Sequence, residues 1–172
     1  MRPVPQSLFP AVLAALVLAA PAAGAPQAGG PGSPGPQTVS VAPVAAVHLA
    51  PRGAAEARVS VTVAEGFHIQ ANPAAADYLI ATRLAVKASP GIKAGKPVYP
   101  KGKPYQLQGS DDKMSIYDGT FEIVVPLRAA AVAPPGERTL RATLRFQACD
   151  DRACYAPVSV PVEIPIQVAA PR

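Results

Sequence analysis

The sequence predicts an all-β fold, and three observations support the prediction. The chain has 22 prolines and 13 glycines among 172 residues, a composition that disfavours helices because proline lacks the backbone donor a helix needs. Apolar and polar residues alternate with a period of two along several segments, as in strands that bury one face. Turn-forming residues separate these segments. Together these observations predict an antiparallel β-sandwich of immunoglobulin-like type.

The alternating segments give six or seven predicted strands. The clearest is Leu140 to Phe146, in which an apolar residue at every second position alternates with arginine or threonine. In chain order the predicted strands are Val44 to Leu49, Val59 to Val63, Ile80 to Val86, Phe121 to Leu127, Leu140 to Phe146 and Val158 to Val168, and His68 falls in a short strand beside Phe67 and Ile69. Pro161 and Pro165 cannot donate to a ladder, so we expect the last strand at a sheet edge or with bulges.

Turn chemistry separates the predicted strands. The turn signals are Pro51-Arg52-Gly53, Glu65-Gly66, Ser89-Pro90-Gly91, Asp118-Gly119 and Pro134-Pro135-Gly136. The stretch from Gly91 to Ser110 differs, because it carries several lysines and prolines but no acidic residue. We expect a solvated loop that crosses between the two sheets. The alternative is a surface that attracts an acidic partner or anionic lipid.

The N-terminal segment has the features of a secretory signal. Arg2 provides a basic start, the run from Leu8 to Ala20 is largely apolar, and small residues follow. We therefore predict a signal peptide over residues 1–25, with cleavage between about Ala22 and Ala25. A membrane anchor is the alternative, but the apolar run is shorter than the ~18 residues that a span requires. The mature chain is expected to be exported and soluble.

A linker and one domain follow the predicted signal peptide. Residues 26–38 consist mainly of Pro, Gly and Ala and cannot bury enough apolar surface to offset the entropy of ordering. We expect a flexible linker there and a single β-sandwich domain over residues 39–172. The overall hydrophobic content of 49% is too high for a chain that is disordered throughout.

The two cysteines are the residues most informative about function. Cys149 and Cys154 lie between two predicted strands, with only Asp150 to Ala153 separating them, so both fall at the mouth of a hairpin. In an exported chain a disulfide is the expected state of such a pair. Closing so small a loop stabilises a fold by only about 2 kcal/mol in the entropic account. The residues alone leave a structural bridge and an exchange-active one open, with free thiols or a metal site as lesser alternatives.

Other function classes find little support. His48, His68 and Met114 show no tight metal-ligand spacing with the cysteines, so we expect no metal and no cofactor. No nucleophile elbow, phosphate-binding loop or paired-carboxylate motif is present. The net charge of +5 with 16% charged residues does not demand a polyanionic partner. We therefore expect neither a nucleic acid partner nor a small-molecule substrate.

Three segments resemble a known family. Phe146 to Pro157, which contains both cysteines, resembles the cysteine hairpin of the N-terminal domain of the thiol:disulfide interchange protein DsbD. Gly66 to Pro73, followed by Tyr78 to Leu84, is similar to an early strand of that family and the loop after it. Tyr117 to Gly119 is similar to its cap region. The resemblance extends over about residues 40 to 168.

The resemblance implies a periplasmic immunoglobulin-like domain that shuttles reducing equivalents. Cys149 and Cys154 become the redox pair, with Cys154 forming the mixed disulfide and Cys149 resolving it, and Tyr117 becomes a cap residue that shields the sulfurs. The implied partners are thioredoxin-like periplasmic oxidoreductases, which correct disulfides or mature c-type cytochromes. The chain ends at Arg172 without the family's membrane conductor, so we expect a separate one.

The resemblance therefore predicts that the chain is a component of a thiol–disulfide oxidoreductase system. The alternative is a non-catalytic, exported protein-interaction domain, docking through a sheet edge or the lysine-rich stretch, in which the disulfide is only structural. The two hypotheses differ in one prediction: loss of both cysteines abolishes function in a redox component and leaves it intact in an interaction domain.

Overall fold

The computed structural model describes residues 38–106 and 113–170. The predicted signal peptide, 1–25, and the predicted linker, 26–38, lie outside the described residues apart from Thr38. The described residues form twelve strands. They are β1 (Val39–Val41), β2 (Val47–Leu49), β3 (Ala54–Val63), β4 (His68–Gln70), β5 (Arg83–Val86), β6 (Ile92–Ala94), β7 (Lys103–Gln106), β8 (Lys113–Tyr117), β9 (Thr120–Ala129), β10 (Gly136–Phe146), β11 (Ala148–Cys149) and β12 (Val158–Val168). Within these ranges no helix is long and apolar enough to cross a membrane.

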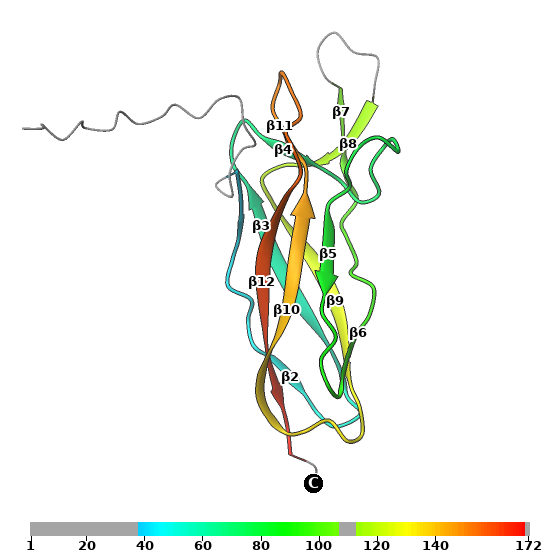
Figure 1. Ribbon diagram of the computed structural model, residues 1–172, viewed down its shortest axis with the longest axis vertical. Helices are drawn as coiled ribbons and strands as arrows, with labels where there is room; N and C mark the ends of the chain where they lie inside the picture. Colours follow the sequence, from blue (N-terminus) through cyan, green and yellow to red (C-terminus); the bar gives the residue numbers. More distant parts are fainter. Residues whose placement is uncertain (1–37, 107–112, 171–172) are drawn as a thin grey trace, which may run out of the picture. The chain divides into compact units, whose positions relative to one another are not determined.

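The strands form three sheets of four strands each. Two large sheets have the strand orders β1-β3-β9-β6 and β2-β12-β10-β5, and a third, smaller sheet has the order β11-β4-β8-β7. Figure 1 shows the third sheet at the end of the domain away from the C-terminus. Neighbouring strands are antiparallel except for β2 and β12, which pair in parallel. The two large sheets share one core, so the predicted β-sandwich is confirmed.

The core forms by the alternation that the sequence pattern predicts. Along most of β3, β9, β10 and β12, every second side chain is buried and the side chains between them face outwards. The largest fully buried side chains come from both large sheets and include Ile123 and Leu127 of β9, Leu140, Leu144 and Phe146 of β10, and Ile164 and Ile166 of β12. The strongly alternating segments were therefore correctly predicted as strands that bury one face.

The prolines of β12 lie where the sequence analysis places them. Pro161 and Pro165 pair on one side with Thr143 and Thr139 of β10. On its other side β12 pairs with β2 only at Ile166–Val168. The proline-containing part of β12 is thus a sheet edge, where a missing backbone donor breaks no ladder, and the expected edge position is confirmed.

The prediction of one loop over Gly91 to Ser110 is wrong in part. β6 and β7 both form within this stretch, and residues 107–110 lie outside the described ranges. Each strand has only three or four residues and carries lysine, so neither shows a period-two pattern long enough to recognise. They are held by pairing with β9 and β8. Short strands of this kind raise the strand number from the predicted six or seven to twelve.

Four predicted strand starts differ from the structure by three or more residues. The strands predicted from Val59 and Leu140 begin earlier, at Ala54 and Gly136. The strand predicted from Val44 begins at Val47, and the strand predicted from Ile80 begins at Arg83. The backbone amide of Ile80 donates to the side chain of Gln147 (3.1 Å) instead of to a neighbouring strand. A side-chain acceptor from a distant segment therefore replaces the ladder there, which the local pattern does not reveal.

The tight turn between β8 and β9 positions one edge of the third sheet. Asp118 and Gly119 alone connect the two strands, and Gly119 has a φ of 57°, a conformation that glycine adopts at little cost. The turn predicted at these two residues is confirmed. It also places Asp118 beside the cysteine-containing end of the domain.

Candidate functional site

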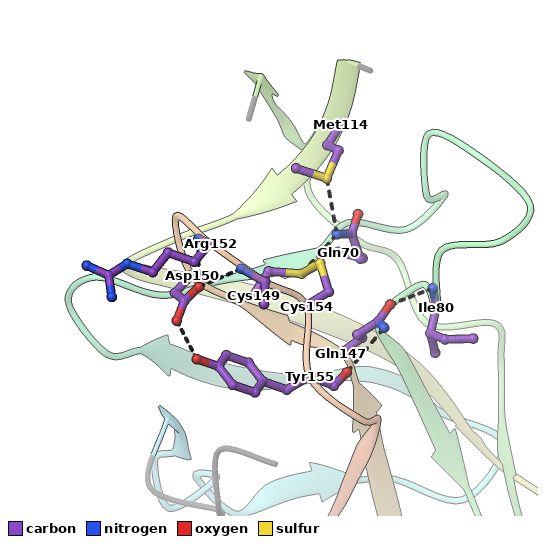
Figure 2. Close-up of a disulfide and its surroundings, with 10 residues drawn as sticks. Gln70, Ile80, Met114, Gln147, Cys149, Asp150, Arg152, Cys154 and Tyr155 are labelled. Atoms are coloured by element: carbon purple, nitrogen blue, oxygen red, sulfur yellow. Dashed lines mark hydrogen bonds between the residues drawn. A yellow bond between two sulfur atoms is a disulfide. The ribbon is translucent and has the colours of Figure 1, made fainter. Parts of the chain in front are cut away.

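The two cysteines form a disulfide at the end of the domain that carries the third sheet (Figure 2). Cys149 is the last residue of β11, and the chain then turns back so that Cys154 pairs with Cys149. The Tyr155 amide donates to the Ala148 carbonyl (2.9 Å), which closes the base of the hairpin. The Cα atoms of the two cysteines lie 4.0 Å apart. The predicted hairpin and the bridge across its mouth are therefore both formed.

Asp150 orders the tip of this hairpin. Its amide donates to the Ala153 carbonyl (3.0 Å), and its carboxylate Oδ1 accepts from the amides of Arg152 and Ala153, both at 2.8 Å. The other carboxylate oxygen accepts the Tyr155 hydroxyl. The hydrogen bond from Tyr155, followed by those from the two amides, lowers the pKa of Asp150 from 3.8 to about 2. The same contact raises the pKa of Tyr155.

The two cysteines differ in exposure. Cys149 is 1% exposed, whereas Cys154 is an exposed residue. A thiolate arriving from solvent therefore has access to Cys154 before Cys149. Attack on the sulfur of Cys154 releases the sulfur of Cys149 as the leaving group. The arrangement thus suits an exchange that begins at Cys154.

One face of the third sheet gathers the side chains around the disulfide. Directly opposed residues on neighbouring strands point to the same face of a sheet, and the register opposes Cys149 to His68, Gln70 to Ile116, and Tyr105 to Met114. We call this side of the sheet the sulfur face. Its members are Cys149, His68, Gln70, Met114, Ile116, Tyr105 and Lys103, which come from all four strands.

The side-chain amide of Gln70 forms a hydrogen bond with the disulfide. Its Nε2 donates to Cys149 Sγ at 3.4 Å and to Met114 Sδ at 3.6 Å. Figure 2 shows this amide nitrogen between the sulfur of Met114 and the disulfide. Gln70 itself is fully buried. The buried side-chain amide of Gln70 therefore links the sulfur of Cys149 to the thioether of Met114.

Tyr117 lies on the opposite face of the third sheet. It is opposed to Ile69, and its ring stacks on Phe121 with the ring centroids 4.4 Å apart. Its hydroxyl accepts from the Asn72 amide (3.0 Å) and donates to the Pro100 carbonyl (2.9 Å), and burial raises its pKa. The structure does not bring Tyr117 and Cys149 to the same face. The shielding role that the resemblance implies for Tyr117 stays a prediction.

An open cleft of about 600 Å³ lies beside the hairpin. His68, Tyr105, Asp118 and Asp151 contribute to its lining. His68 is 5% exposed, its Nε2 has no hydrogen-bond partner, and its ring lies 4.3 Å from that of Tyr105, measured between centroids. Burial lowers the pKa of His68 more than the nearby carboxylates of Asp150 and Asp118 raise it. In the described part of the chain, no three His, Cys, Asp or Glu side chains are arranged to hold a metal ion.

The sequence analysis did not identify Gln70 or the bond between Asp150 and Tyr155 as part of the site. Gln70 stands between the apolar residues Ile69 and Ala71. A polar residue between apolar neighbours is the one sequence feature that points to Gln70 as a site residue. The contact of Gln70 with Cys149, however, joins residues 79 positions apart. It depends on the pairing of β4 with β11, which no local pattern predicts.

A solved structure of another protein shares this fold. The N-terminal domain of DsbD from Neisseria meningitidis, in its reduced form, has a TM-score of 0.50 and 17% identity, over 76% of this chain and 87% of that chain. This likeness confirms the immunoglobulin-like fold. The N-terminal periplasmic domain of ScsB from Proteus mirabilis has a TM-score of 0.48 and 12% identity, over 73% of this chain. The match spans only 44% of the ScsB chain. No curated protein matches the sequence.

The family match covers the site as well as the fold. A family model described as the N-terminal domain of the thiol:disulfide interchange protein DsbD matches residues 36–164. This range contains both cysteines, the hairpin between them and all four strands of the third sheet. The resemblance noted in the sequence is therefore confirmed, and the chain belongs to the family of DsbD N-terminal domains.

Proposed function

We propose that this chain is a periplasmic carrier of reducing equivalents whose Cys149–Cys154 pair exchanges with thioredoxin-like partners. The observation that carries the proposal is the pairing of an exposed Cys154 with a buried Cys149 at the tip of a hairpin in a domain of this family. Thiol–disulfide exchange requires one sulfur that a partner thiolate can reach and a second sulfur that can leave. The hairpin supplies both.

Reduction of the pair proceeds in two steps. A thiolate of the partner's dithiol attacks Cys154 Sγ and forms a mixed disulfide, while the bond to Cys149 breaks and its electron pair stays on Cys149 as a thiolate. The partner's second thiolate then attacks the partner sulfur of the mixed disulfide and releases Cys154. Two electrons and the two thiol protons pass from the partner to the pair, and the partner is left as a disulfide. Transfer to the next oxidoreductase runs through the same steps in reverse.

The predicted N-terminal signal and the family together support a periplasmic location. Residues 1–25 have the pattern of a signal peptide, residues 26–38 that of a linker, and the domain begins after them. We propose a membrane electron conductor as the electron source. Thioredoxin-like periplasmic oxidoreductases, including those of cytochrome c biogenesis, are the proposed recipients.

The reduction potential of the pair tests the carrier function. We expect a value above about −300 mV, because structural disulfides in secreted proteins lie below that potential. The measurement is equilibration of the purified chain against a dithiothreitol or glutathione couple, followed by quantification of free thiols. A potential well below about −300 mV, together with failure to trap a mixed disulfide, would overturn the proposal.

Trapping with single-cysteine variants tests the order of attack. In Cys149→Ser the thiolate of the exposed Cys154 attacks the disulfide of an oxidised thioredoxin-like partner and forms a mixed disulfide. This chain then has no second cysteine to resolve that bond, so we expect more of the adduct to accumulate than with the parent chain. Cys154→Ser retains only the buried Cys149 and is the matched control, from which we expect little adduct. Both are read by non-reducing electrophoresis. Equal trapping by the two variants contradicts the assignment of Cys154 as the attacked residue.

The competing function is a non-catalytic interaction domain that the disulfide merely stabilises. In that case replacing both cysteines by serine costs about 2 kcal/mol of stability but leaves function intact. Complete loss of electron transfer in the double variant, with an unchanged fold by circular dichroism, rejects this alternative.

A further inference from the structure

Gln70 is held against the disulfide in an environment that does not satisfy its amide. The side chain is fully buried, and its Oε1 has no hydrogen-bond partner. Its Nε2 faces Cys149 Sγ at 3.4 Å and Met114 Sδ at 3.6 Å. A disulfide sulfur and a thioether carry no hydrogen to donate, so the nitrogen is the end of the amide that can bond to them.

The strength of the hydrogen bond from Gln70 Nε2 depends on the oxidation state of Cys149. Thioether and disulfide sulfurs are weak acceptors, so Gln70 is poorly compensated for its burial while the bridge is closed. A thiolate is charged, and hydrogen bonds to charged acceptors are about twice as strong as those between neutral groups. The N–H of Gln70 therefore interacts more strongly with Cys149 after the bridge has opened than before.

Backbone contacts fix the position of this donor. The backbone carbonyl of Gln70 accepts hydrogen bonds from the backbone amide of Thr82 (3.1 Å) and from the Thr82 hydroxyl (2.5 Å). The backbone amide of Gln70 donates to the backbone carbonyl of Gln147 (3.3 Å). Thr82 is itself fully buried. The donor is thus in place before the reaction, so little reorganisation is needed when charge develops on the sulfur.

We propose that Gln70 acts directly in disulfide exchange, because its side-chain amide stabilises the Cys149 thiolate released when a partner attacks Cys154. The proposal rests on the proposed carrier function and adds the group that favours the leaving sulfur. The partner's dithiol supplies the electrons and protons as described above, and Gln70 exchanges neither. It acts on the leaving group, and a leaving thiol that ionises more readily departs faster.

The test measures ionisation of Cys149 directly. In a full-length Cys154→Ser chain, the ultraviolet absorbance of the thiolate is followed against pH, with Gln70 present and with Gln70→Met. We expect the pH of half-ionisation to rise by about one unit in the Gln70→Met background, because a donor to the charged form has been removed. Gln70→Asn shortens the side chain by one methylene and moves the amide away from Cys149, so we expect the pH of half-ionisation to rise in this variant as well. An unchanged midpoint in both variants overturns the proposal.

Two control variants separate this role from a structural one. Gln147 is also a partly buried glutamine near the disulfide, but its side chain bonds the Ile80 amide and the Tyr155 carbonyl. Gln147→Met should lower the thermal unfolding midpoint without moving the ionisation of Cys149. Met114→Leu removes the other sulfur and keeps the donor, so ionisation of Cys149 should stay at the parent value or shift to lower pH. An upward shift in either control, equal to that of Gln70→Met, would show a general packing effect and contradict the proposal.

The rate of exchange gives a second measurement, made in the chain with both cysteines. Reduction by dithiothreitol at pH 7 is expected to be about threefold slower in Gln70→Met than in the parent, as Brønsted coefficients near 0.5 give for one pH unit. The small dithiol requires no protein partner. If the carrier function fails but Gln70 acts as proposed, Gln70→Met still raises the pH of Cys149 half-ionisation and slows reduction by dithiothreitol, while trapping of a protein partner is lost. If only the role of Gln70 fails, a partner is still trapped, and Gln70→Met changes neither the half-ionisation pH nor the reduction rate.

Discussion

At the scale of single residues, the hairpin tip is organised by one carboxylate. Asp150 bonds two backbone amides and the Tyr155 hydroxyl, so its ionised form is the one that fits the turn. This arrangement keeps the pKa of Asp150 at about 2. At neutral pH the tip therefore carries a fixed negative charge next to the exposed Cys154. The conformation that presents Cys154 depends on that charge.

A prediction about acid stability follows from the lowered pKa of Asp150. The folded-state value of about 2 lies below the ordinary 3.8, so the stabilisation is fully present above about pH 4 and is lost as the pH falls towards 2. Tyr155→Phe removes the largest cause, and we expect the pKa of Asp150 to move towards 3.8 in that variant. The measurement is a carboxyl-carbon NMR titration. Asp151→Asn, which changes the exposed neighbour, is the control; the same Asp150 midpoint in Tyr155→Phe as in the parent contradicts the prediction.

At the scale of elements, the third sheet depends on close packing of the Gly102 backbone against Ser115 and Ala71. Gly102 stands just before β7, and a Cβ built there would lie 2.1 Å from Ser115 Oγ and 2.6 Å from the Ala71 Cβ. The Ala71 contact is with a short side chain that cannot rotate away. Glycine is therefore needed there for β7 to pair with β8, and that pairing helps to build the sulfur face.

We expect Gly102→Ala to destabilise the domain by about 3 kcal/mol, because overpacking a tight contact forces the backbone apart. Gly66→Ala is the matched control. Gly66 differs from Gly102 in having a positive φ (80°), but its Cβ would meet open space, so only backbone strain of about 1 kcal/mol is expected. Chemical denaturation gives both values, and hydrogen exchange should quicken at β8 amides in Gly102→Ala alone. Equal costs for the two substitutions would show that the close approach is not decisive.

At the scale of the whole domain, the disulfide and the core are separate sources of stability. The core is shared by the two large sheets, in which Leu144 and Ile164 are fully buried, whereas the disulfide closes a short hairpin at one end. Closing a loop of this size contributes about 2 kcal/mol. A bridge that makes a small contribution can open and close without unfolding the domain, which a redox carrier requires.

We therefore predict that the reduced chain stays folded and loses about 2 kcal/mol of unfolding free energy. Leu144→Ala, which leaves the bridge closed but creates a cavity in the core, should cost more, about 3 kcal/mol. Urea denaturation of the oxidised, reduced and variant chains measures the three values. A reduced chain that is unfolded at room temperature would contradict the prediction and would favour a structural role for the bridge.

Much of the fold could be predicted because it rests on neighbouring residues. Period-two alternation identified β10 and β12, glycine identified the turn at Gly119, and the prolines of β12 indicated its edge position. The spacing of Cys149 and Cys154 indicated the hairpin. The strands that the pattern did not reveal are two to five residues long, namely β1, β6, β7, β8 and β11. Such strands carry too little pattern and are held by their pairing partners.

By itself, then, the sequence determined that this chain is a β-sandwich of the DsbD N-terminal family with two cysteines facing each other across a hairpin. The tertiary structure alone decided which cysteine is buried, that Tyr117 points to the face away from the sulfurs, and that Gln70 meets Cys149. The physical reason is the range of the interactions. Burial periodicity and turn chemistry act between residues a few positions apart, whereas the sulfur face exists only where β11, β4, β8 and β7 pair.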